Sequence, residues 1–367
     1  MLNMNILFVI NNLITGGAER MLTDTLLHLD RENLQVDLVL LSKKETFLKE
    51  QLHQAGQINL IELQHQSPYN LLGVWELNRI LKNKTYDLIH VHLLPSLYYV
   101  RLAMVLTQSH SKLIYTEHCP IVKKRQNLLF RYIDLWCYRG ISKVLCVSQA
   151  VKESVISHLK TKDTFKYVVL NNALNLSRYQ NAQPALRKNY GLEDNDFICL
   201  QVSSFRPAKD HKTLLKAFKD TPKRFKLLLA GNGPLLSETR SLCAKMDLND
   251  RVIFLKEQSE IASLYAMTSV VILSSHYEGF GLAVLEGMAA GKPVLATNVG
   301  GLKDLIASEQ YLFAPGDANT LRKLLLKLES DSEFYTQASE NGLEKAQHYD
   351  IKIRNNSLLK IYHGLVN

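Results

Sequence analysis

Short apolar runs rich in β-branched residues alternate with longer amphipathic stretches along the whole chain, and this alternation restricts its fold more than any other feature. In the first half the predicted strands are 5–10, 35–40, 58–63, 88–91, 112–116 and 143–147, and amphipathic stretches such as 19–29 and 71–81 lie between them. Runs that are apolar throughout fit strands buried on both faces, and helices that join such strands build a parallel sheet. The pattern therefore predicts an α/β fold.

The same alternation starts again in the second half of the chain. Its predicted strands are 197–202, 225–230, 252–255, 270–273, 293–296 and 311–313. The stretch NNALNLSRYQNAQ, 171–183, is polar and weakly periodic, and a proline follows it, so we expect a domain boundary there. A chain of 367 residues is also too long for one ordinary core.

We therefore predict two doubly wound, Rossmann-like domains. The first would cover 1–178 and the second 179–350, and a helix over 351–367 would return to the first. Ligands of such sheets bind beyond the carboxyl ends of the strands, and two domains that face one another would form a cleft for them.

The net charge of +9 is uneven along the chain. Residues 1–170 hold 20 Lys and Arg against 14 Asp and Glu, whereas 171–367 hold 24 against 21. A basic surface favours anionic partners, namely phosphorylated small molecules, nucleic acid or acidic lipids, and charge alone does not choose among them.

Cysteine usage and the apolar runs bear on the compartment. The five cysteines are scattered and form no C-x-x-C pair, which indicates a reducing compartment and no zinc site. The N-terminus has no basic segment before its short apolar run, and the longest apolar stretch, 93–106, contains Pro95 and Arg101. We expect neither a signal peptide nor a membrane span, and therefore a cytoplasmic protein.

Two glycine-rich turns follow predicted strands. Gly16 and Gly17 precede a helix whose free N–H groups suit an anion, and the turn Gly231-Asn232-Gly233 also leads into a helix. Each turn has two interpretations, an ordinary tight βα turn or a phosphate-binding loop. The first is not G-x-G-x-x-G, and no acidic residue for a ribose follows the second strand, so a nicotinamide site is disfavoured.

The stretch HYEGFGLAVLEGMAAGKPVLA, residues 276–296, is more informative. It predicts a loop after a strand and then a helix that is apolar almost all round, in which the lone Glu286 requires a partner. Glu286 suits hydrogen bonds from a ribose diol and Glu278, at the edge of the loop, suits those from a sugar. The backbone amides expected to face a diphosphate belong to Gly279, Phe280, Gly281 and Leu282.

These motifs resemble the retaining glycosyltransferases of the GT-B architecture, in the group called family 4. Glu278 and Glu286 match the E-x7-E signature of that family. The turn Gly16-Gly17-Ala18-Glu19 resembles its N-terminal glycine loop, and AGNGPL resembles a turn of its second domain. The continuation GMAAGKPVLATNVGGLKDLI matches the family frame at Gly287, Ala289, Gly291, Pro293, Val294, Gly300, Gly301, Leu305 and Ile306.

The resemblance implies a role for individual residues. Glu286 would bind the nucleotide ribose and Glu278 the transferred sugar, while Gly16 would approach the diphosphate or the acceptor. His118, in LIYTEHCP, matches a family histidine near the anomeric carbon, and Lys209 matches a lysine on the diphosphate.

One position departs from the family. Ser204 stands where an arginine that contacts the diphosphate is expected, and Arg206 lies two residues downstream, so the role of Arg206 is in question. Lys212 is expected to be a solvated helix charge. Fixed cations can replace a divalent metal, and the sequence has no Asp-x-Asp or His/Cys cluster, so we expect no metal and no cofactor besides the donor.

A basic and aromatic segment lies at 121–143. It contains one acid, Asp134, and six basic residues, Lys123, Lys124, Arg125, Arg131, Arg139 and Lys143. Apolar Leu128, Leu129, Tyr132, Leu135 and Trp136 recur in it at helical spacing. Two interpretations remain open, a helix that docks on anionic headgroups or a lipid-linked acceptor, and a domain helix with a wet basic face. Nucleic acid is not an expected partner because the sequence contains no recognisable nucleic-acid module.

The leading hypothesis is a retaining, metal-independent transferase. It would move a hexose or N-acetylhexosamine from a nucleotide-diphosphate sugar, with uridine as the base, to a saccharide or lipid-linked saccharide in cell-envelope glycan synthesis, at most peripherally bound to the inner face of the membrane. Two alternatives remain: a nucleotide-sugar 2-epimerase, which shares the fold, and a non-catalytic subunit that binds sugar nucleotides.

Overall fold

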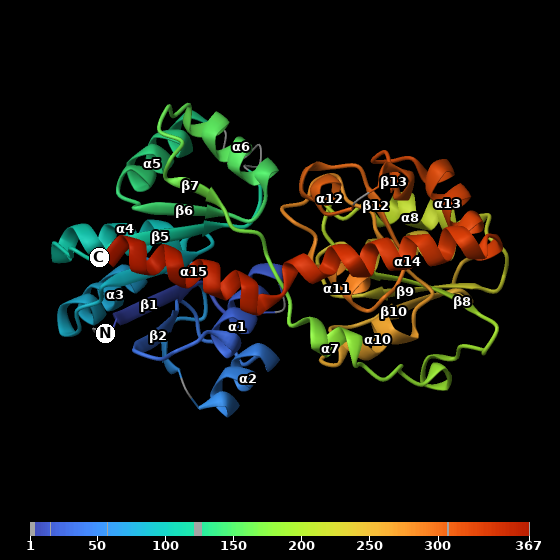
Figure 1. The fold of residues 1–367 in the computed structure, drawn as a ribbon, viewed down its shortest axis with the longest axis horizontal. Helices are drawn as coiled ribbons and strands as arrows, with labels where there is room; N and C mark the ends of the chain where they lie inside the picture. The colour runs from blue at the N-terminus through green and yellow to red at the C-terminus, as the bar shows by residue number, and fades with distance from the viewer. Residues whose placement is uncertain (1–3, 15, 57, 121–126, 307, 367) are drawn as a thin grey trace. The chain divides into compact units, whose positions relative to one another are not determined.

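The computed structural model describes residues 4–14, 16–56, 58–120, 127–306 and 308–366, and the chain folds into two compact units (Figure 1). The first unit contains 1–172 together with 351–367, and the second contains 173–350. Each unit has a parallel sheet with helices on both faces, as the alternating pattern predicts.

The first unit contains a seven-stranded sheet in the order β3-β2-β1-β4-β5-β6-β7. Every described strand pair in it is parallel. Its strands are β1 Met4–Ile10, β2 Leu34–Leu40, β3 Asn59–Glu62, β4 Leu88–His92, β5 Lys112–Glu117, β6 Lys143–Cys146 and β7 Tyr167–Val169. Its helices are α1 Gly17–His28, α2 Phe47–Ala55, α3 Leu72–Asn83, α4 Ser96–Thr107, α5 Leu128–Arg139, α6 Gln149–Leu159 and α15 Ile351–Val366.

The direction of the chain through this sheet decides which face each helix covers. The chain moves from β1 outward to β3, then crosses back to β4 and continues to β7. Because βαβ crossovers are right-handed, connections that run in opposite directions place their helices on opposite faces. Helices α1 and α2 therefore share one face, and α3, α4, α5 and α6 share the other.

The second unit contains a six-stranded parallel sheet in the order β10-β9-β8-β11-β12-β13. Its strands are β8 Phe197–Val202, β9 Phe225–Ala230, β10 Val252–Leu255, β11 Val270–Leu273, β12 Val294–Thr297 and β13 Leu312–Phe313. Its helices are α7 Leu176–Gln180, α8 His211–Lys219, α9 Leu236–Lys245, α10 Ile261–Met267, α11 Leu282–Ala289, α12 Gly300–Leu305, α13 Ala318–Ser330 and α14 Ser332–Ala346, and short 3₁₀ turns span Arg187–Tyr190, Glu309–Tyr311 and Gln347–Tyr349.

The predicted domain boundary needs a correction. We placed it between 178 and 179, and the units divide between 172 and 173. The reason is α7, which is short and polar enough to be taken for linker but packs on α10 and α11 of the second unit. Its Leu176 and Tyr179 are buried there.

One strand was missed. Each strand predicted from the sequence has a counterpart within two residues at either end, but β7, Tyr167–Val169, was not predicted. A run of only three residues, YVV, is too short to show a periodic pattern.

The C-terminal helix α15 packs against α1 in the first unit (Figure 1). Leu358 and Tyr362 of this helix are fully buried in one apolar cluster with residues of β1 and α1. The last residues of the chain therefore complete the core of the unit in which the chain begins.

This packing predicts the effect of shortening one side chain. Leu358→Ala should lower the free energy of unfolding of the first unit by about 2–5 kcal/mol, because it leaves a cavity in a close-packed cluster. Both tryptophans of the chain, Trp75 and Trp136, lie in this unit, so urea unfolding followed by tryptophan fluorescence measures its stability. The control is Ile353→Ala on the same helix, where the side chain is 55% exposed and little should change. Equal losses in the two variants would contradict the role given to α15.

Candidate active site

The sheet of the second unit changes direction next to its first strand. From β8 the chain moves outward to β9 and β10, and it then returns to β11 on the other side of β8 before it continues to β12 and β13. The loops after β8 and β11 therefore leave neighbouring strands and part in opposite directions, which is where doubly wound sheets bind ligands. Lys209 lies in the first of these loops and Glu278 in the second.

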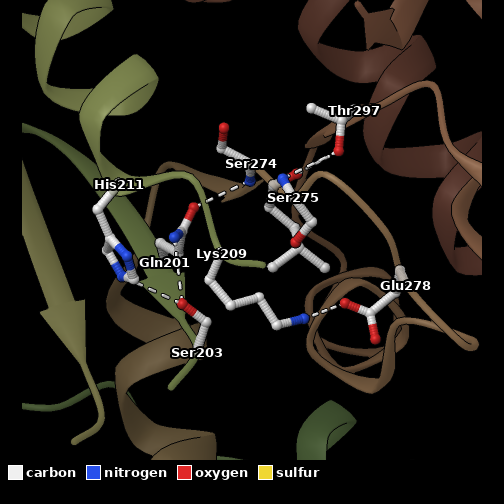
Figure 2. A network of polar contacts seen from close by, with 9 residues as sticks. Gln201, Ser203, Lys209, His211, Ser274, Ser275, Glu278 and Thr297 are labelled. Atoms are coloured by element: carbon white, nitrogen blue, oxygen red, sulfur yellow. Dashed lines mark hydrogen bonds and ion pairs between the residues drawn. The ribbon is translucent and has the colours of Figure 1, made fainter. Parts of the chain in front are cut away.

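Figure 2 shows that a buried glutamine holds the two strand ends together. The Oε1 atom of Gln201 accepts a hydrogen bond of 3.0 Å from the backbone N–H of Ser274, and its Nε2 donates over 3.1 Å to Oγ of Ser203. On the other side of β11, Oγ1 of Thr297 accepts from the N–H of Ser275 over 3.0 Å. These side chains satisfy backbone donors that the ladder leaves unpaired at the strand ends. The positions of both loops are thereby fixed.

Lys209 and Glu278 form an ion pair across this switch point (Figure 2). Both side chains are largely buried, at 19% and 17% exposed. Two further contacts join the same loops: the N–H of His276 donates over 2.8 Å to the carbonyl of Ala208, and Nε2 of His276 lies 3.6 Å from Oδ2 of Asp210. The structure thus brings together two of the residues singled out in the sequence.

The turn after β9 is packed against the loop after β8. Gly231 has φ of +139°, and a Cβ atom there would collide with the carbonyl oxygen of Ser203. The carbonyl of Asn232 accepts from the N–H of Phe205 over 3.0 Å, and its Oδ1 accepts from the N–H of Gly233 over 2.8 Å. The glycine is therefore explained by close backbone packing, and a ligand role for Gly231 and Asn232 stays a prediction.

The loop that leads into α11 presents an uncapped helix start. Gly281 precedes α11 with φ of +97°, a conformation that favours glycine, and no described side chain caps the first turn. Phe280 is buried, and its ring centroid lies 5.5 Å from that of Tyr349. Phe280 thus anchors the loop, while the amides from Gly279 to Leu282 remain candidates for a diphosphate.

Glu286 has the partners that a carboxylate in an apolar helix requires, and the described ones belong to the protein itself. The carboxylate is 4% exposed, and its two oxygens accept hydrogen bonds of 2.7 Å from the hydroxyls of Tyr179 and Tyr265. Burial is therefore accounted for within the protein. Each carboxylate oxygen has a second lone pair, so a ribose diol remains chemically compatible with this position.

The first unit has a switch point of the same kind between β1 and β4. Asn11, just after β1, donates from Nδ2 over 2.7 Å to the carbonyl of Leu94, and its Oδ1 accepts over 2.7 Å from Oγ of Ser96. Between β4 and these residues, Leu93 adopts φ of +65°, which is uncommon for a residue other than glycine. The amide of Asn11 thus holds the loop after β4 as Gln201 holds the loop after β11.

Gly16 and Gly17 lie at the start of α1, beside this switch point. A Cβ atom at Gly16 would collide with the carboxylate of Glu19, which lies buried in the first turn of the helix. A carboxylate at a helix N-terminus is itself stabilising. The glycine therefore makes room for Glu19, and contact of Gly16 or Gly17 with a diphosphate stays a prediction.

His118 follows β5 directly and belongs to a ladder of imidazole rings. Its Nε2 lies 3.0 Å from Nδ1 of His92 at the end of β4, and the rings of His92 and His90 are 4.4 Å apart. His90 is held at both nitrogens, by Tyr362 Oη at 2.6 Å and Thr116 Oγ1 at 2.7 Å. The Nδ1 atom of His118 and Nε2 of His92 are buried and without a partner in the described part of the chain.

Burial keeps this ladder uncharged. Burial, and to a smaller extent the charge of Arg354, lowers the pKa of His118 to about 3. Burial also holds the pKa values of His90 and His92 well below their usual value. Arg354, from α15, is itself buried and donates to the carbonyl of Asn171 over 3.2 Å and to Oγ1 of Thr25 over 3.0 Å. A neutral imidazole can offer a lone pair to a nearby cation, which a protonated one cannot.

Arg206 is on the same loop as Lys209, and its carbonyl accepts a hydrogen bond of 2.9 Å from the N–H of Lys209. Arg206 is exposed, and within the described residues it forms no ion pair that joins it to Lys209 and Glu278. Lys123, Lys124 and Arg125 lie outside the described residues. In the part of the chain that the structure describes, no group of three His, Cys, Asp or Glu side chains is arranged to hold a metal ion.

The most informative partners were not predicted. His92, Tyr179 and Tyr265 bond to residues that we did single out, and Gln201 joins the loops that carry Lys209 and Glu278. None of the four was named from the sequence. A signal existed for two of them: Gln201 in FICLQV and His92 in LIHVH are polar residues at the ends of apolar strands, where buried polar groups require partners.

Two doubly wound units with parallel sheets are the architecture of the GT-B fold, and this chain has that fold. The chain belongs to glycosyltransferase family 4. Residues 15–178 match the model of "Glycosyltransferase Family 4", and residues 182–345 match that of "Glycosyl transferases group 1".

Named relatives and solved structures agree with this assignment. The chain is 28% identical to N-acetyl-alpha-D-glucosaminyl L-malate synthase of Bacillus anthracis over 300 residues, 78% of this chain and 77% of the relative. It is 23% identical to a UDP-Gal:alpha-D-GlcNAc-diphosphoundecaprenol alpha-1,3-galactosyltransferase of Escherichia coli, over 70% of this chain and 69% of the relative. The crystal structure of Anabaena HepE in complex with UDP-glucose superposes with a TM-score of 0.86, at 22% identity, over 98% of this chain and all of that one.

The uncharged histidines predict how stability depends on pH. Their pKa values are lower in the folded state than in the unfolded chain, so below about pH 6.5 the unfolded chain binds more protons and stability falls as the pH falls. Each such histidine adds a slope of at most about 1.4 kcal/mol per pH unit in this range. His90→Gln should therefore flatten the decline between pH 6.5 and 5, measured by urea unfolding followed by tryptophan fluorescence.

The control for this experiment is His363→Gln, at an exposed position of α15 where the ring is solvated in both states. It should leave the decline as it is in the unaltered chain. Equal slopes in the unaltered chain and in His90→Gln would show that His90 is not the source of the pH dependence.

Proposed function

We propose that this glycosyltransferase moves a hexose or N-acetylhexosamine from a uridine-diphosphate sugar to a saccharide or a lipid-linked saccharide, with retention of the anomeric configuration. The observation that carries the proposal is the ion pair of Lys209 and Glu278 at the switch point of the second unit. It places a cation and an acid, both largely buried, where two loops leave neighbouring strands.

The pair suits a donor that is anionic at one end and rich in hydroxyls at the other. In the structure, Lys209 and Glu278 form an ion pair with each other. A diphosphate offers Lys209 a more highly charged partner, and Glu278 is then available to accept hydrogen bonds from sugar hydroxyls. Binding of the donor would thus exchange one ion pair for two separate charge-assisted contacts.

The charges that develop during transfer agree with this arrangement. Cleavage of the bond between the anomeric carbon and the diphosphate leaves negative charge on the phosphate, which Lys209 and the amides from Gly279 to Leu282 would stabilise. We propose that Arg206, exposed on the same loop as Lys209, also stabilises this negative charge when the donor is bound. Fixed cations would then serve in place of a divalent metal.

We propose that His118 stabilises the positive charge that develops on the anomeric carbon of the sugar. Its ring is uncharged, and one nitrogen is oriented by His92 at 3.0 Å. The acceptor hydroxyl would attack from the face that the diphosphate leaves, and a phosphate oxygen would take its proton. This course retains the anomeric configuration and requires no covalent intermediate.

The nature of donor and acceptor rests on the relatives. The E. coli relative is named for transfer from UDP-Gal to a diphosphoundecaprenol-linked sugar, and the similar crystal structure holds UDP-glucose. These names support a uridine-linked donor and an envelope glycan acceptor for this chain. The five free cysteines agree with a reducing compartment, and we propose that the reaction takes place on the cytoplasmic side of the membrane.

Removal of either member of the ion pair should nearly abolish transfer. We expect Lys209→Ala and Glu278→Ala each to lower kcat by a hundredfold or more, equivalent to about 2.7 kcal/mol, because each removes a group that acts where charge develops. The measurement is release of UDP from a panel of uridine-linked sugars with the acceptor present. The matched control is Lys212→Ala, three residues from Lys209 and exposed on α8, which should keep most of the activity. Near-normal turnover in both site variants would refute this site.

The stereochemistry and the metal requirement are tested separately. Proton NMR of the product made from an α-linked donor should show an α-linkage, and the initial rate should be unchanged after treatment with EDTA. A β-linked product would refute the retaining course, and a loss of rate that Mg²⁺ or Mn²⁺ restores would refute independence from metal.

A further inference from the structure

One face of the first unit exposes large apolar side chains that most soluble proteins would bury. Eleven of the nineteen large apolar side chains that are exposed among the described residues belong to α3, α4, α5 and the turn before α3. They are Tyr69, Leu71, Leu72, Trp75, Leu102, Val105, Leu106, Leu129, Phe130, Tyr132 and Trp136. We call these positions and the basic side chains of the same three helices the α3–α5 surface.

The three helices form one continuous layer. Helix α3 packs against α4 and α4 against α5, and the right-handed crossovers place all three on the same face of the sheet. The guanidinium of Arg101 on α4 lies 5.2 Å from the ring centroid of Trp136 on α5, so the two helices also meet at their outer edge. The exposed faces of the three helices therefore point to the same side of the unit.

Basic residues accompany the apolar ones, and both acids of the three helices have partners within the unit. The basic residues of α3, α4 and α5 are Arg79, Lys82, Arg101, Arg131 and Arg139. Their two acids are Glu76, which lies against His65, and Asp134, which is fully buried and bonded to Tyr98 and His158. An exposed face that combines aromatic and aliphatic side chains with Lys and Arg is typical of segments that lie in the membrane interface.

We propose that the α3–α5 surface docks on a bilayer that contains anionic lipid, with the apolar side chains in the headgroup region and the basic ones on phosphate. The charge selects this occupant. A second copy of the chain would bring the same surface against itself and place these cations opposite one another, which is unfavourable. None of the described helices has both the length and the apolar content to cross a bilayer, so the contact is peripheral.

This inference goes beyond the transferase activity, and the two are tested independently, since vesicle binding needs neither donor nor acceptor. The probes are vesicles of equal parts phosphatidylglycerol and phosphatidylcholine, with pure phosphatidylcholine vesicles for comparison. The full chain should float with the mixed vesicles at 0.1 M salt and be largely released at 1 M, where the screening length falls from about 10 Å to about 3 Å.

The chain contains its own reporter for this contact. Its only two tryptophans, Trp75 and Trp136, both belong to the α3–α5 surface, at 67% and 43% exposed. Tryptophan fluorescence should therefore shift to shorter wavelength when mixed vesicles are added, and lipids with brominated chains should quench it, because both rings would enter the interface.

Two matched variants separate this surface from basic charge in general. Arg79→Glu with Arg139→Glu should weaken binding to the mixed vesicles at least tenfold. Lys44→Glu with Lys360→Glu makes the same change of charge at exposed positions of the same unit outside these helices and should weaken binding much less. Trp75→Ser should also weaken binding, whereas Phe165→Ser, at a position 89% exposed in the loop before β7, should not. Circular dichroism verifies that each variant is folded.

Three results would overturn the proposal. The first is that the unaltered chain fails to float with mixed vesicles at low salt. The second is that the two double variants lose affinity equally, which would make the contact one of net charge alone. The third is that, without vesicles, the tryptophan emission shifts with protein concentration while sedimentation shows a dimer, which would assign the surface to a second copy.

Discussion

Each unit depends on one buried or half-buried amide at the point where its sheet changes direction. The backbone at the end of a central strand has donors and acceptors that no ladder satisfies, and the two loops that leave there must still be held. Asn11 meets this need between β1 and the loop after β4, and Gln201 meets it between β8 and the loop after β11. An amide suits both places because it donates and accepts at once. With the loops fixed, His92 and Glu278 come to defined positions beside β1 and β8.

The two candidate clusters handle charge in different ways. In the second unit, Lys209 and Glu278 form an ion pair at a partly buried position. In the first unit, burial removes charge from three histidines, and the only nearby charge described is that of buried Arg354. The first cluster therefore carries charge of both signs, whereas the histidines of the second are neutral.

Sequence patterns were sufficient for the architecture, and they singled out the candidate residues. The strands were predictable because parallel strands buried on both faces are apolar throughout, as in β9 and β11, and Glu278 and Glu286 were recognisable by their spacing. What failed was short or lay in tertiary contacts. Strand β7 has three residues, and α7 resembles a linker until it is packed on α10 and α11.

The partners of the candidate residues escaped prediction for a related reason. Tyr179 lies 107 positions before the carboxylate that it bonds, and Tyr362 lies 272 positions after His90. No local pattern connects residues so distant in the chain. The apolar face of α5 was visible in the sequence, but only the packing of α3 and α4 beside it revealed a continuous surface.

The return of α15 to the first unit has a consequence for biosynthesis. Ribosomes deliver the chain from its N-terminus, so residues 1–172 emerge long before the helix that covers the cluster around Phe8 and Leu26. The second unit is continuous in sequence and can fold as soon as it has emerged. The first unit lacks α15 until that helix has been translated, and part of its apolar cluster is open to water until then. We therefore expect the nascent chain to be prone to aggregation until α15 has been translated.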